Sequence, residues 1–247
     1  MDNLKSKIGL VIPCYNEQDR LPVSAILDYL AGNAHVTILL VNDGSNDKTG
    51  EIIDEAGRKC PGQAHTLHLP RNVGKAEAVR QGIMSASEEN DTEWVGFWDA
   101  DLSTPLTEIQ TMLDYAAHET DLLMCSRVKR LGASVKRHLW RHVAGRVMAT
   151  LISNVLKLPV YDTQCGAKLV HRRIVQEVFS SPFLTKWLFD VEILARLIQQ
   201  RGRDAVLRGV TEVPIAKWRD IGGSKLGFRG MLRALIEIVR IKISYRL

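Results

Sequence analysis

Residues 8–45 read IGLVIPCYNEQDRLPVSAILDYLAGNAHVTILLVNDGS and hold two apolar runs on either side of an amphipathic segment. The runs at 8–13 and 36–41 have the length and composition of buried strands, and residues 21–30 between them predict a helix. A strand, a helix and a second strand in this order make a βαβ unit, whose two strands lie parallel. The segment therefore predicts an α/β fold with a mostly parallel, Rossmann-like sheet flanked by helices.

The same alternation continues through residue 126 and then becomes less regular. Up to that point we expect two more helices, at 48–59 and 74–87, and three more strands, at 66–69, 94–98 and 121–126. Pro105 lies near the start of another helix, where its missing N–H is not needed. Beyond residue 126 we expect helices at 137–158, 189–200 and 228–245 and strands at 164–171 and 205–216. No internal repeat or linker interrupts the chain, so we expect one domain over residues 1–247.

The two halves of the chain carry opposite charge. Residues 1–126 contain 9 Lys and Arg against 20 Asp and Glu, a net charge of −11, whereas residues 127–247 contain 24 against 8, a net charge of +16. Such asymmetry indicates two electrostatic tasks, because an acidic half suits a cation and a basic half suits phosphates or an anionic surface. The alternative is that the charged residues of both halves simply lie on faces in contact with water, which would give the same counts.

Cysteine spacing and hydropathy argue against several kinds of protein. The four cysteines, Cys14, Cys60, Cys125 and Cys165, form no CxxC pair, which disfavours both a zinc site and a redox pair. The sequence shows no signal peptide and no apolar stretch near the roughly 18 residues that a membrane span requires. We therefore expect reduced thiols and a cytoplasmic protein.

Polar side chains cluster where three of the predicted strands end. Pro13, Tyr15 and Glu17 surround the end of the first strand, Asp43 follows the second, and residues 99–101 follow the fourth. Open α/β sheets bind ligands at this edge. A tyrosine ring can pack on a nucleobase, and carboxylates can accept from base N–H and ribose hydroxyl groups. The sequence lacks both GxGxxG and GxxxxGK[ST], so neither a dinucleotide cofactor nor an ATPase is indicated.

Asp99-Ala100-Asp101 is the triplet most typical of a metal site. Two carboxylates directly after a strand rich in Trp and Phe concentrate negative charge, which a hard divalent cation would neutralise. Mg²⁺ or Mn²⁺ held by Asp99 and Asp101 would in turn bridge to the oxygens of a diphosphate. Helix capping is the alternative, with one aspartate capping a helix that begins near Thr104 and the other in water.

Four motifs resemble those of a known enzyme family. They are VIPCYNE at 11–17, VNDGSNDKT at 41–49, RNVGKAEAVRQG at 71–82 and WDADLSTP at 98–105, and their order and spacing are similar to those of family 2 inverting glycosyltransferases. The resemblance implies the GT-A nucleotide-sugar-binding fold. It implies that the nucleoside is held by Pro13, Tyr15, Glu17 and Asp43 and that Lys75 lies near the diphosphate. It also implies that Asp99, Ala100 and Asp101 line the nucleotide-sugar site, with the two aspartates catalytic.

Motifs in the second half of the sequence resemble one branch of this family in particular. DTQCGAKL at 162–169, KWLFDVEIL at 186–194 and EVPIAKWRDIGGSKL at 212–226 resemble the dolichyl-phosphate glucosyltransferases, a branch related to the dolichyl-phosphate mannose synthases. The eukaryotic glucosyltransferases carry an N-terminal membrane anchor, which we do not expect here, and the mannose synthases commonly have glutamine where this chain has Ser103. We interpret residues 1–126 as the nucleotide-sugar-binding half, 127–225 as the acceptor half and 226–247 as a C-terminal basic amphipathic helix.

An acceptor phosphate has requirements of its own. A phosphate monoester is already ionised near neutral pH, so the protein has to orient it rather than deprotonate it. Our candidates for binding it are Arg127, Arg137, Ser224 and Lys225. Guanidinium groups match phosphate oxygens, and the glycines before Ser224 let the backbone approach an anion. For each arginine, the alternative is an exposed position on the surface without a role in phosphate binding.

Asp190 is expected to lie in the catalytic site, with two alternative tasks. For a hydroxyl acceptor it would be the general base that takes the proton as the oxygen attacks. For a phosphate acceptor it would orient the sugar or a Lys or Arg partner. Capping the helix that follows is the structural alternative.

Residues 228–245 predict a basic amphipathic helix. Its apolar side holds Phe228, Met231, Leu232, Leu235, Ile238 and Val239, and its other side holds Arg229, Arg233 and Arg240. Such a helix can lie in an anionic membrane interface, and Trp140 with Arg137 and Arg141 could make a second contact of this kind. Packing on its own domain, with the arginines in water, is the alternative.

These interpretations lead to one main function. We expect inverting transfer of a hexose, glucose from UDP-glucose, to polyprenyl or dolichyl phosphate, with Mg²⁺ or Mn²⁺, on the cytoplasmic face of a membrane. The alternatives are mannose from GDP-mannose, a sugar hydroxyl as acceptor in polysaccharide or glycoprotein assembly, and a peripheral membrane or nucleic-acid binding protein without catalysis. The acidic loops would repel a phosphodiester backbone, so we expect no nucleic-acid partner. The sequence predicts no oligomeric state.

Overall fold

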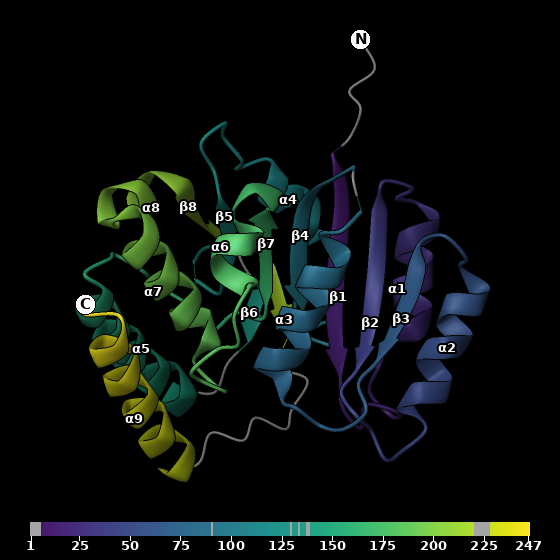
Figure 1. Ribbon diagram of the computed structural model, residues 1–247, viewed down its shortest axis with the longest axis horizontal. Helices are drawn as coiled ribbons and strands as arrows, with labels where there is room; N and C mark the ends of the chain where they lie inside the picture. The colour runs from purple at the N-terminus through teal and green to yellow at the C-terminus, as the bar shows by residue number, and fades with distance from the viewer. Residues whose placement is uncertain (1–5, 90, 129, 133, 137–138, 220–227) are drawn as a thin grey trace.

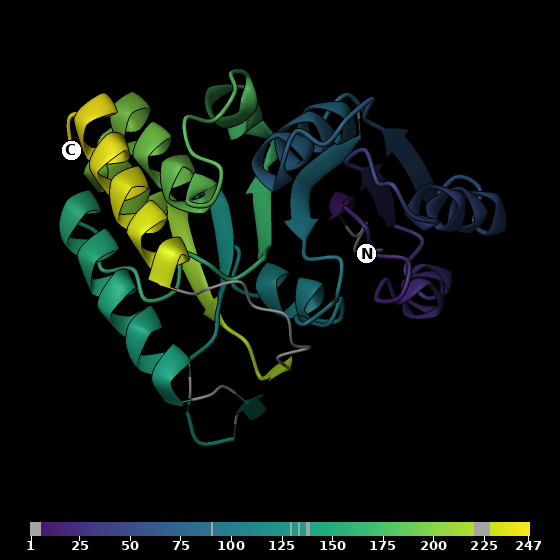
Figure 2. The same cartoon turned by 90° about the horizontal axis from the view of Figure 1, so that it is seen from below.

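A seven-stranded sheet crosses the molecule, with helices packed on both of its faces (Figure 1; Figure 2). The computed structural model describes residues 6–247 except 90, 129, 133, 137–138 and 220–227. The spatial order of the sheet is β3-β2-β1-β4-β7-β5-β8. Its strands are β1 (Lys7–Cys14), β2 (Val36–Asn42), β3 (Ala64–His68), β4 (Thr92–Trp98), β5 (Leu122–Ser126), β7 (Ala167–His171) and β8 (Val210–Pro214).

Most of the sheet is parallel. β1 pairs in parallel with β2 and β4, β2 with β3, and β5 with β8. β7 lies between β4 and β5 and runs antiparallel to both. Two short strands, β6 (Ser134–Lys136) and β9 (Lys217–Arg219), pair in parallel outside the main sheet. The predicted α/β fold with a mostly parallel sheet is therefore confirmed.

Each face of the sheet has its own hydrophobic core, because successive side chains of a strand point to opposite faces. On β4, Trp94 and Trp98 belong to one core, whereas Val95 and Phe97 belong to the other. The first core is covered by α1 (Val23–Ala31), α2 (Thr49–Lys59) and α4 (Glu108–Leu113). The second is covered by α3 (Lys75–Ala86), α5 (Leu139–Leu156), α6 (Val175–Phe179), α7 (Phe189–Arg201), α8 (Arg203–Gly209) and α9 (Phe228–Ser244).

Helices α5 and α9 lie side by side at the outer end of the second face (Figure 1; Figure 2). A 3₁₀ turn at Arg172–Ile174 joins β7 to α6. Within the part of the chain that the structure describes, no helix combines the length and hydropathy needed to span a bilayer.

One predicted strand was wrong over half of its length. The strand expected at 205–216 is a helix, α8, up to Gly209, and only Val210–Pro214 pairs with β5. Gly202 has φ +80° and ends α7, which lets the chain begin a new helix in which Val206 is buried and Leu207 is exposed. An apolar run as short as this does not distinguish a strand from a helix. Helix α6 and the β6–β9 pair were not predicted at all.

Two glycines differ in the space around them. Gly96 of β4 pairs with Leu169 of β7, and a Cβ at Gly96 would overlap the backbone oxygen of Lys168. Gly145 lies in α5, and nothing lies within 4 Å of a Cβ built there. The closely packed sheet therefore disfavours alanine at position 96, whereas the helix surface accepts it at 145.

We expect Gly96→Ala to lower the free energy of unfolding by about 1–3 kcal/mol, because the backbone of β7 would have to move. Gly145→Ala is the matched control and should raise that free energy by about 0.5–1 kcal/mol, since alanine favours a helix. Urea denaturation followed by circular dichroism measures both values. A Gly96→Ala protein as stable as the wild type would contradict the close β4–β7 contact.

Candidate active site

The carboxyl ends of β1, β2 and β4 lie along one edge of the sheet, the lower edge in Figure 1. Pro13 is the second-last residue of β1, where it pairs with Val41 of β2. Tyr15 follows β1 and is 42% exposed. Asp43 directly follows β2, and Asp99 directly follows β4. The residues that we expected to hold a nucleotide-sugar therefore share one edge.

Hydrogen bonds join the loops after β1 and β2 into one unit. The Glu17 N–H donates to Thr49 Oγ1 at 2.8 Å, and the Asn16 N–H donates to Ser45 Oγ at 3.0 Å. The Glu17 carboxylate accepts two hydrogen bonds from Arg20, at 2.7 and 2.9 Å. The backbone directly after Tyr15 is thus held in place, next to its exposed ring.

Asp43 ties the second loop to the start of α3. Its buried carboxylate accepts the backbone N–H of Val73 at 2.7 Å and that of Gly74 at 2.9 Å. Burial raises the pKa of Asp43, and these two hydrogen bonds oppose the rise only in part. We expected Asp43 to hold a nucleoside. In the structure its oxygens also fix the turn that precedes Lys75.

Lys75 lies among the carboxylates of the site. Its Nζ is 2.5 Å from Asp99 Oδ1, and both side chains are partly exposed. Burial lowers the pKa of Lys75, but the charges of Asp99, Asp190 and Asp101 outweigh it and hold that pKa above its usual value. Lys75 therefore stays protonated at neutral pH, within the electrostatic reach of all three aspartates.

Asp99 fits its place because residue 166 has no side chain. The Asp99 N–H donates to the Gly166 oxygen at 2.9 Å, and a Cβ at Gly166 would overlap the Asp99 carboxylate. Asp101 Oδ1 accepts the Ser103 N–H at 2.9 Å, and the buried Ala100 lies between the two aspartates. The next helix, α4, begins only at Glu108. Asp101 thus stabilises a local turn and does not cap a helix near Thr104.

Asp190 is buried in the first turn of α7 and is paired with a buried lysine. Lys168 Nζ lies 2.5 Å from Asp190 Oδ1 and also donates to the backbone oxygens of Cys165 at 2.8 Å and Thr163 at 3.0 Å. Lys168 has no exposed surface, and these three acceptors satisfy its ammonium group. Sequence reasoning assigned Lys168 no role. Its position in the DTQCGAKL motif was the available signal.

Arg127 is also paired. Its guanidinium donates to both oxygens of Asp162, at 2.6 and 2.8 Å, and its backbone N–H donates to the same carboxylate at 3.1 Å. Burial lowers the pKa of Arg127, but the charge of Asp162 outweighs it and raises that pKa above its usual value. An acceptor phosphate would therefore meet Arg127 together with Asp162. The other candidates, Arg137, Ser224 and Lys225, lie outside the described residues.

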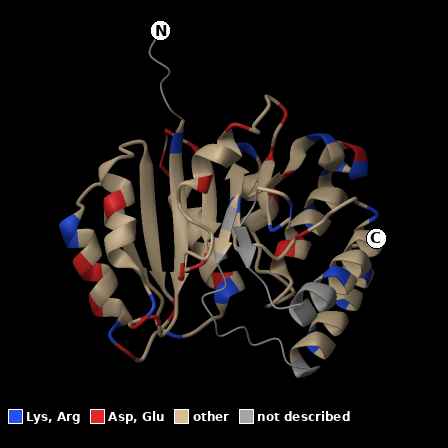
Figure 3. Cartoon of the chain, turned by 180° about the vertical axis from the view of Figure 1, so that it is seen from behind, with Lys and Arg blue, Asp and Glu red and all other residues tan. Residues whose placement is uncertain are grey.

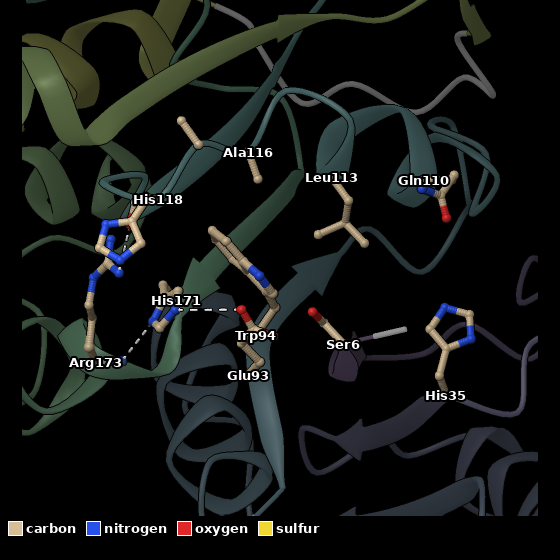
Figure 4. A pocket seen from close by; sticks show the side chains of 11 residues that line it. Ser6, His35, Glu93, Trp94, Gln110, Leu113, Ala116, His118, His171 and Arg173 are labelled. Atoms are coloured by element: carbon tan, nitrogen blue, oxygen red, sulfur yellow. Dashed lines mark hydrogen bonds and ion pairs between the residues drawn. The ribbon is translucent and has the colours of Figure 1, made fainter. Parts of the chain in front are cut away.

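A cavity of about 550 Å³ lies at the opposite edge of the sheet, near the start of β1 and β4 (Figure 4). His171 stacks edge-on against Trp94, and its Nε2 lies 3.9 Å from Glu93 Oε1. Arg173 also lines this cavity, but its guanidinium is already bonded to Asp121 at 2.6 Å. None of the predicted site residues lines it. The chemistry that we expect therefore belongs to the carboxyl edge.

The mostly parallel sheet, with carboxylates and a lysine at its carboxyl edge, and the family match together identify a glycosyltransferase. The chain belongs to glycosyl transferase family 2, whose family model matches residues 10–179. It is 32% identical to the dolichyl-phosphate beta-glucosyltransferase ALG5C of Trichomonas vaginalis, over 96% of this chain and 71% of that protein. It is 27% identical to the human dolichyl-phosphate beta-glucosyltransferase, over 99% of this chain and 77% of the relative.

Solved structures support the GT-A fold. Glucosyl-3-phosphoglycerate synthase from Mycobacterium tuberculosis, in complex with Mn²⁺, UDP-glucose and phosphoglyceric acid, aligns with a TM-score of 0.66. The alignment covers 96% of this chain and 80% of that one, at 16% sequence identity. The same enzyme in complex with UDP aligns with the same TM-score. The predicted fold class is thus confirmed.

The buried Lys168–Asp190 pair gives a stability test. We expect Lys168→Met to lower the free energy of unfolding by about 3–5 kcal/mol, because Asp190 would stay buried without its counter-charge. The double variant Lys168→Met/Asp190→Leu should regain part of that loss, since no unpaired charge remains. Urea denaturation of the wild type, both single variants and the double variant gives the coupling energy. A coupling energy near zero would contradict a direct pair.

Proposed function

We propose that this protein transfers glucose from UDP-glucose to a dolichyl or polyprenyl phosphate, with inversion at the anomeric carbon. The relatives that match nearly the whole chain are named dolichyl-phosphate beta-glucosyltransferases. A structural neighbour was solved with UDP-glucose and Mn²⁺. Residues 1–126 supply the donor site in this proposal, and residues 127–225 supply the acceptor side.

The observation that carries the proposal is the position of Lys75. Its Nζ lies 2.5 Å from Asp99 Oδ1 and its charge interacts with those of Asp101 and Asp190, so it links carboxylates from two different parts of the chain. When a diphosphate enters, Lys75 can exchange Asp99 for a phosphate oxygen, because its ammonium can donate to either. The site therefore matches a substrate that carries both negative charge and sugar hydroxyl groups.

Asp99 and Asp101 are suited to hold Mg²⁺ or Mn²⁺. Asp99 is partly exposed, and Asp101 keeps one oxygen beyond the one that accepts the Ser103 N–H. In the described residues no three His, Cys, Asp or Glu side chains form a metal-binding group. The remaining ligands would be diphosphate oxygens and water, as is usual for Mg²⁺. Charge neutralisation of the leaving diphosphate is the chemistry that such an ion supplies when bound.

In the transfer step the chain's own residues bind and orient the reactants. An oxygen of the acceptor phosphate attacks the anomeric carbon and forms the new bond, while the bond from that carbon to UDP breaks on the opposite side. The electron pair leaves with UDP, near the protonated Lys75. No proton has to be removed from the acceptor, because the phosphate is already ionised.

Asp190 serves as a fixed anion in this scheme. Its Oδ1 is occupied by Lys168 at 2.5 Å, and the residue is only 5% exposed. It contributes to the charge around Lys75 and orients its lysine partner, Lys168. A general base for a hydroxyl acceptor would need a carboxylate with free access to the incoming oxygen. The phosphate acceptor fits this geometry better.

The outer helices are suited to contact a membrane surface that holds the lipid acceptor. Basic side chains are spread along α9 (Figure 3). Several large apolar side chains of the same helix are exposed: Met231, Leu232, Leu235, Ile236, Val239 and Ile243. Val147 and Leu151 of the neighbouring α5 are exposed as well. Apolar side chains beside arginines match the interface of an anionic bilayer, which supports our proposal that the protein acts at the cytoplasmic face of a membrane.

Donor binding provides the first test. At a UDP concentration about a hundredfold above its Kd, with Mn²⁺, we expect the Tm to rise by about 5–10 °C. This rise should disappear in Asp99→Ala/Asp101→Ala, which removes the proposed metal ligands. Asp28→Ala, an exposed aspartate of α1, is the control and should keep it. A double variant that still shows the full shift would overturn the assignment of these two residues.

The acceptor is tested by incubation with UDP-[¹⁴C]glucose, Mn²⁺ and a short polyprenyl phosphate, with GDP-[¹⁴C]mannose as the competing donor. We expect glucose label in the organic phase. Asp190→Asn should reduce turnover by less than about a hundredfold, because no general base is required, whereas a hydroxyl acceptor would bring a loss of about 10²–10⁴. If no donor ever labels the lipid, the proposed acceptor is wrong.

A further inference from the structure

Helix α7 begins without a cap from its own segment. Leu188, at the N-cap position, makes no side-chain capping bond. The hydrogen-bond acceptor comes from α9 instead. There the Glu237 carboxylate accepts the backbone N–H of Leu188 at 2.8 Å, of Trp187 at 3.1 Å and of Lys186 at 3.2 Å. A carboxylate at the amino end of a helix is favoured by the helix dipole and satisfies N–H groups that would otherwise lack partners.

A second contact from the end of α9 holds the same segment. The Tyr245 hydroxyl donates to Glu192 Oε1 at 2.8 Å. Glu192 is fully buried and also accepts the backbone N–H of Leu184 and of Thr185, each at 2.9 Å. Burial, followed by the hydrogen bond to Glu192, raises the pKa of Tyr245 to about 12, so this hydroxyl keeps its proton at neutral pH. Residues 186–192 are thus bonded at one end to Glu237 of α9 and at the other end to Tyr245, the residue that follows α9.

Asp190 lies inside this doubly held segment. It is two residues beyond Leu188, the last N–H donor to Glu237, and two residues before Glu192. Its carboxylate reaches across to Lys168 on β7. A shift of residues 186–188 would therefore move Asp190 relative to Lys168 and to Lys75. Such a shift needs no substitution of a residue that touches the substrate.

We propose that Glu237 is a positioning residue for the transfer reaction: through the backbone of residues 186–188 it fixes Asp190 at the donor site. This inference rests on the proposed function, since it takes Asp190 as part of that site. Glu237 belongs to α9, and this helix lies away from the loops after β1 and β2 (Figure 1). Its effect is transmitted through main-chain hydrogen bonds, not through contact with UDP-glucose or with the lipid.

The variants Glu237→Gln and Glu237→Ala test whether Glu237 positions Asp190. Glutamine keeps one acceptor oxygen and loses the charge, whereas alanine loses both. We expect kcat to fall on the order of tenfold for glutamine and further for alanine, because small displacements of catalytic groups have effects of this size. The KM for UDP-glucose and the thermal shift with UDP and Mn²⁺ should stay within about twofold of wild type. Glu51→Gln, an exposed glutamate of α2, is the control and should leave kcat unchanged.

Hydrogen–deuterium exchange supplies a readout that does not depend on turnover. The amides of residues 186–188 should exchange slowly in the wild type and at least tenfold faster in Glu237→Ala, while those of β1 and β4 stay unchanged. The proposal fails if those amides exchange alike in both proteins. It also fails if kcat is unaffected, or if kcat and UDP affinity fall together with Tm, which would indicate a purely structural role.

The two hypotheses can fail separately. If the wild type labels no lipid phosphate, the proposed acceptor is wrong. The positioning role is then judged on the hydrolysis of UDP-glucose, which uses the same donor site, together with the exchange data. Loss of hydrolysis in Glu237→Ala with unchanged UDP binding would support it, and unchanged hydrolysis would overturn it.

Discussion

Carboxylates gathered at one edge of a sheet repel one another, and Lys75 is a cation that offsets this repulsion at several of them at once. Its Nζ lies 2.5 Å from Asp99, and its charge also interacts with Asp101 and Asp190. Lys75 is in turn placed by the turn before α3, which is bonded to both oxygens of Asp43. The second strand, the third helix and the acidic edge are therefore linked through one cation.

The pairing of a cation with a carboxylate recurs where the side chains are more deeply buried. Lys168 has no exposed surface and is satisfied by Asp190 and two backbone oxygens. Arg127 is held by Asp162 through a bidentate pair. Charges of this kind are costly to bury alone, but each of these has a partner in good geometry. The basic half of the chain thus contributes cations to the interior of the site as well as to the surface.

Sequence reasoning could reach the local features of this arrangement. The strands ending at Cys14, Asn42 and Trp98 are marked by continuous apolar runs, and the polar residues after them follow from the topology of parallel sheets. Family resemblance added roles for these residues. It could not supply the partners of Arg127 and Lys168, which are 35 and 22 residues away along the chain. Lysine is also rarely buried, so a fully buried one is not expected from sequence alone.

The antiparallel strand β7 has a consequence for biosynthesis. It enters the sheet between β4 and β5, so the edge of β4 stays open until the chain has been made as far as His171. An uncovered strand edge is a template for pairing with another chain. On a polysome, where neighbouring nascent chains are close together, β4 is thus an uncovered edge on which chains can misassemble until β7 has been made and has left the ribosome.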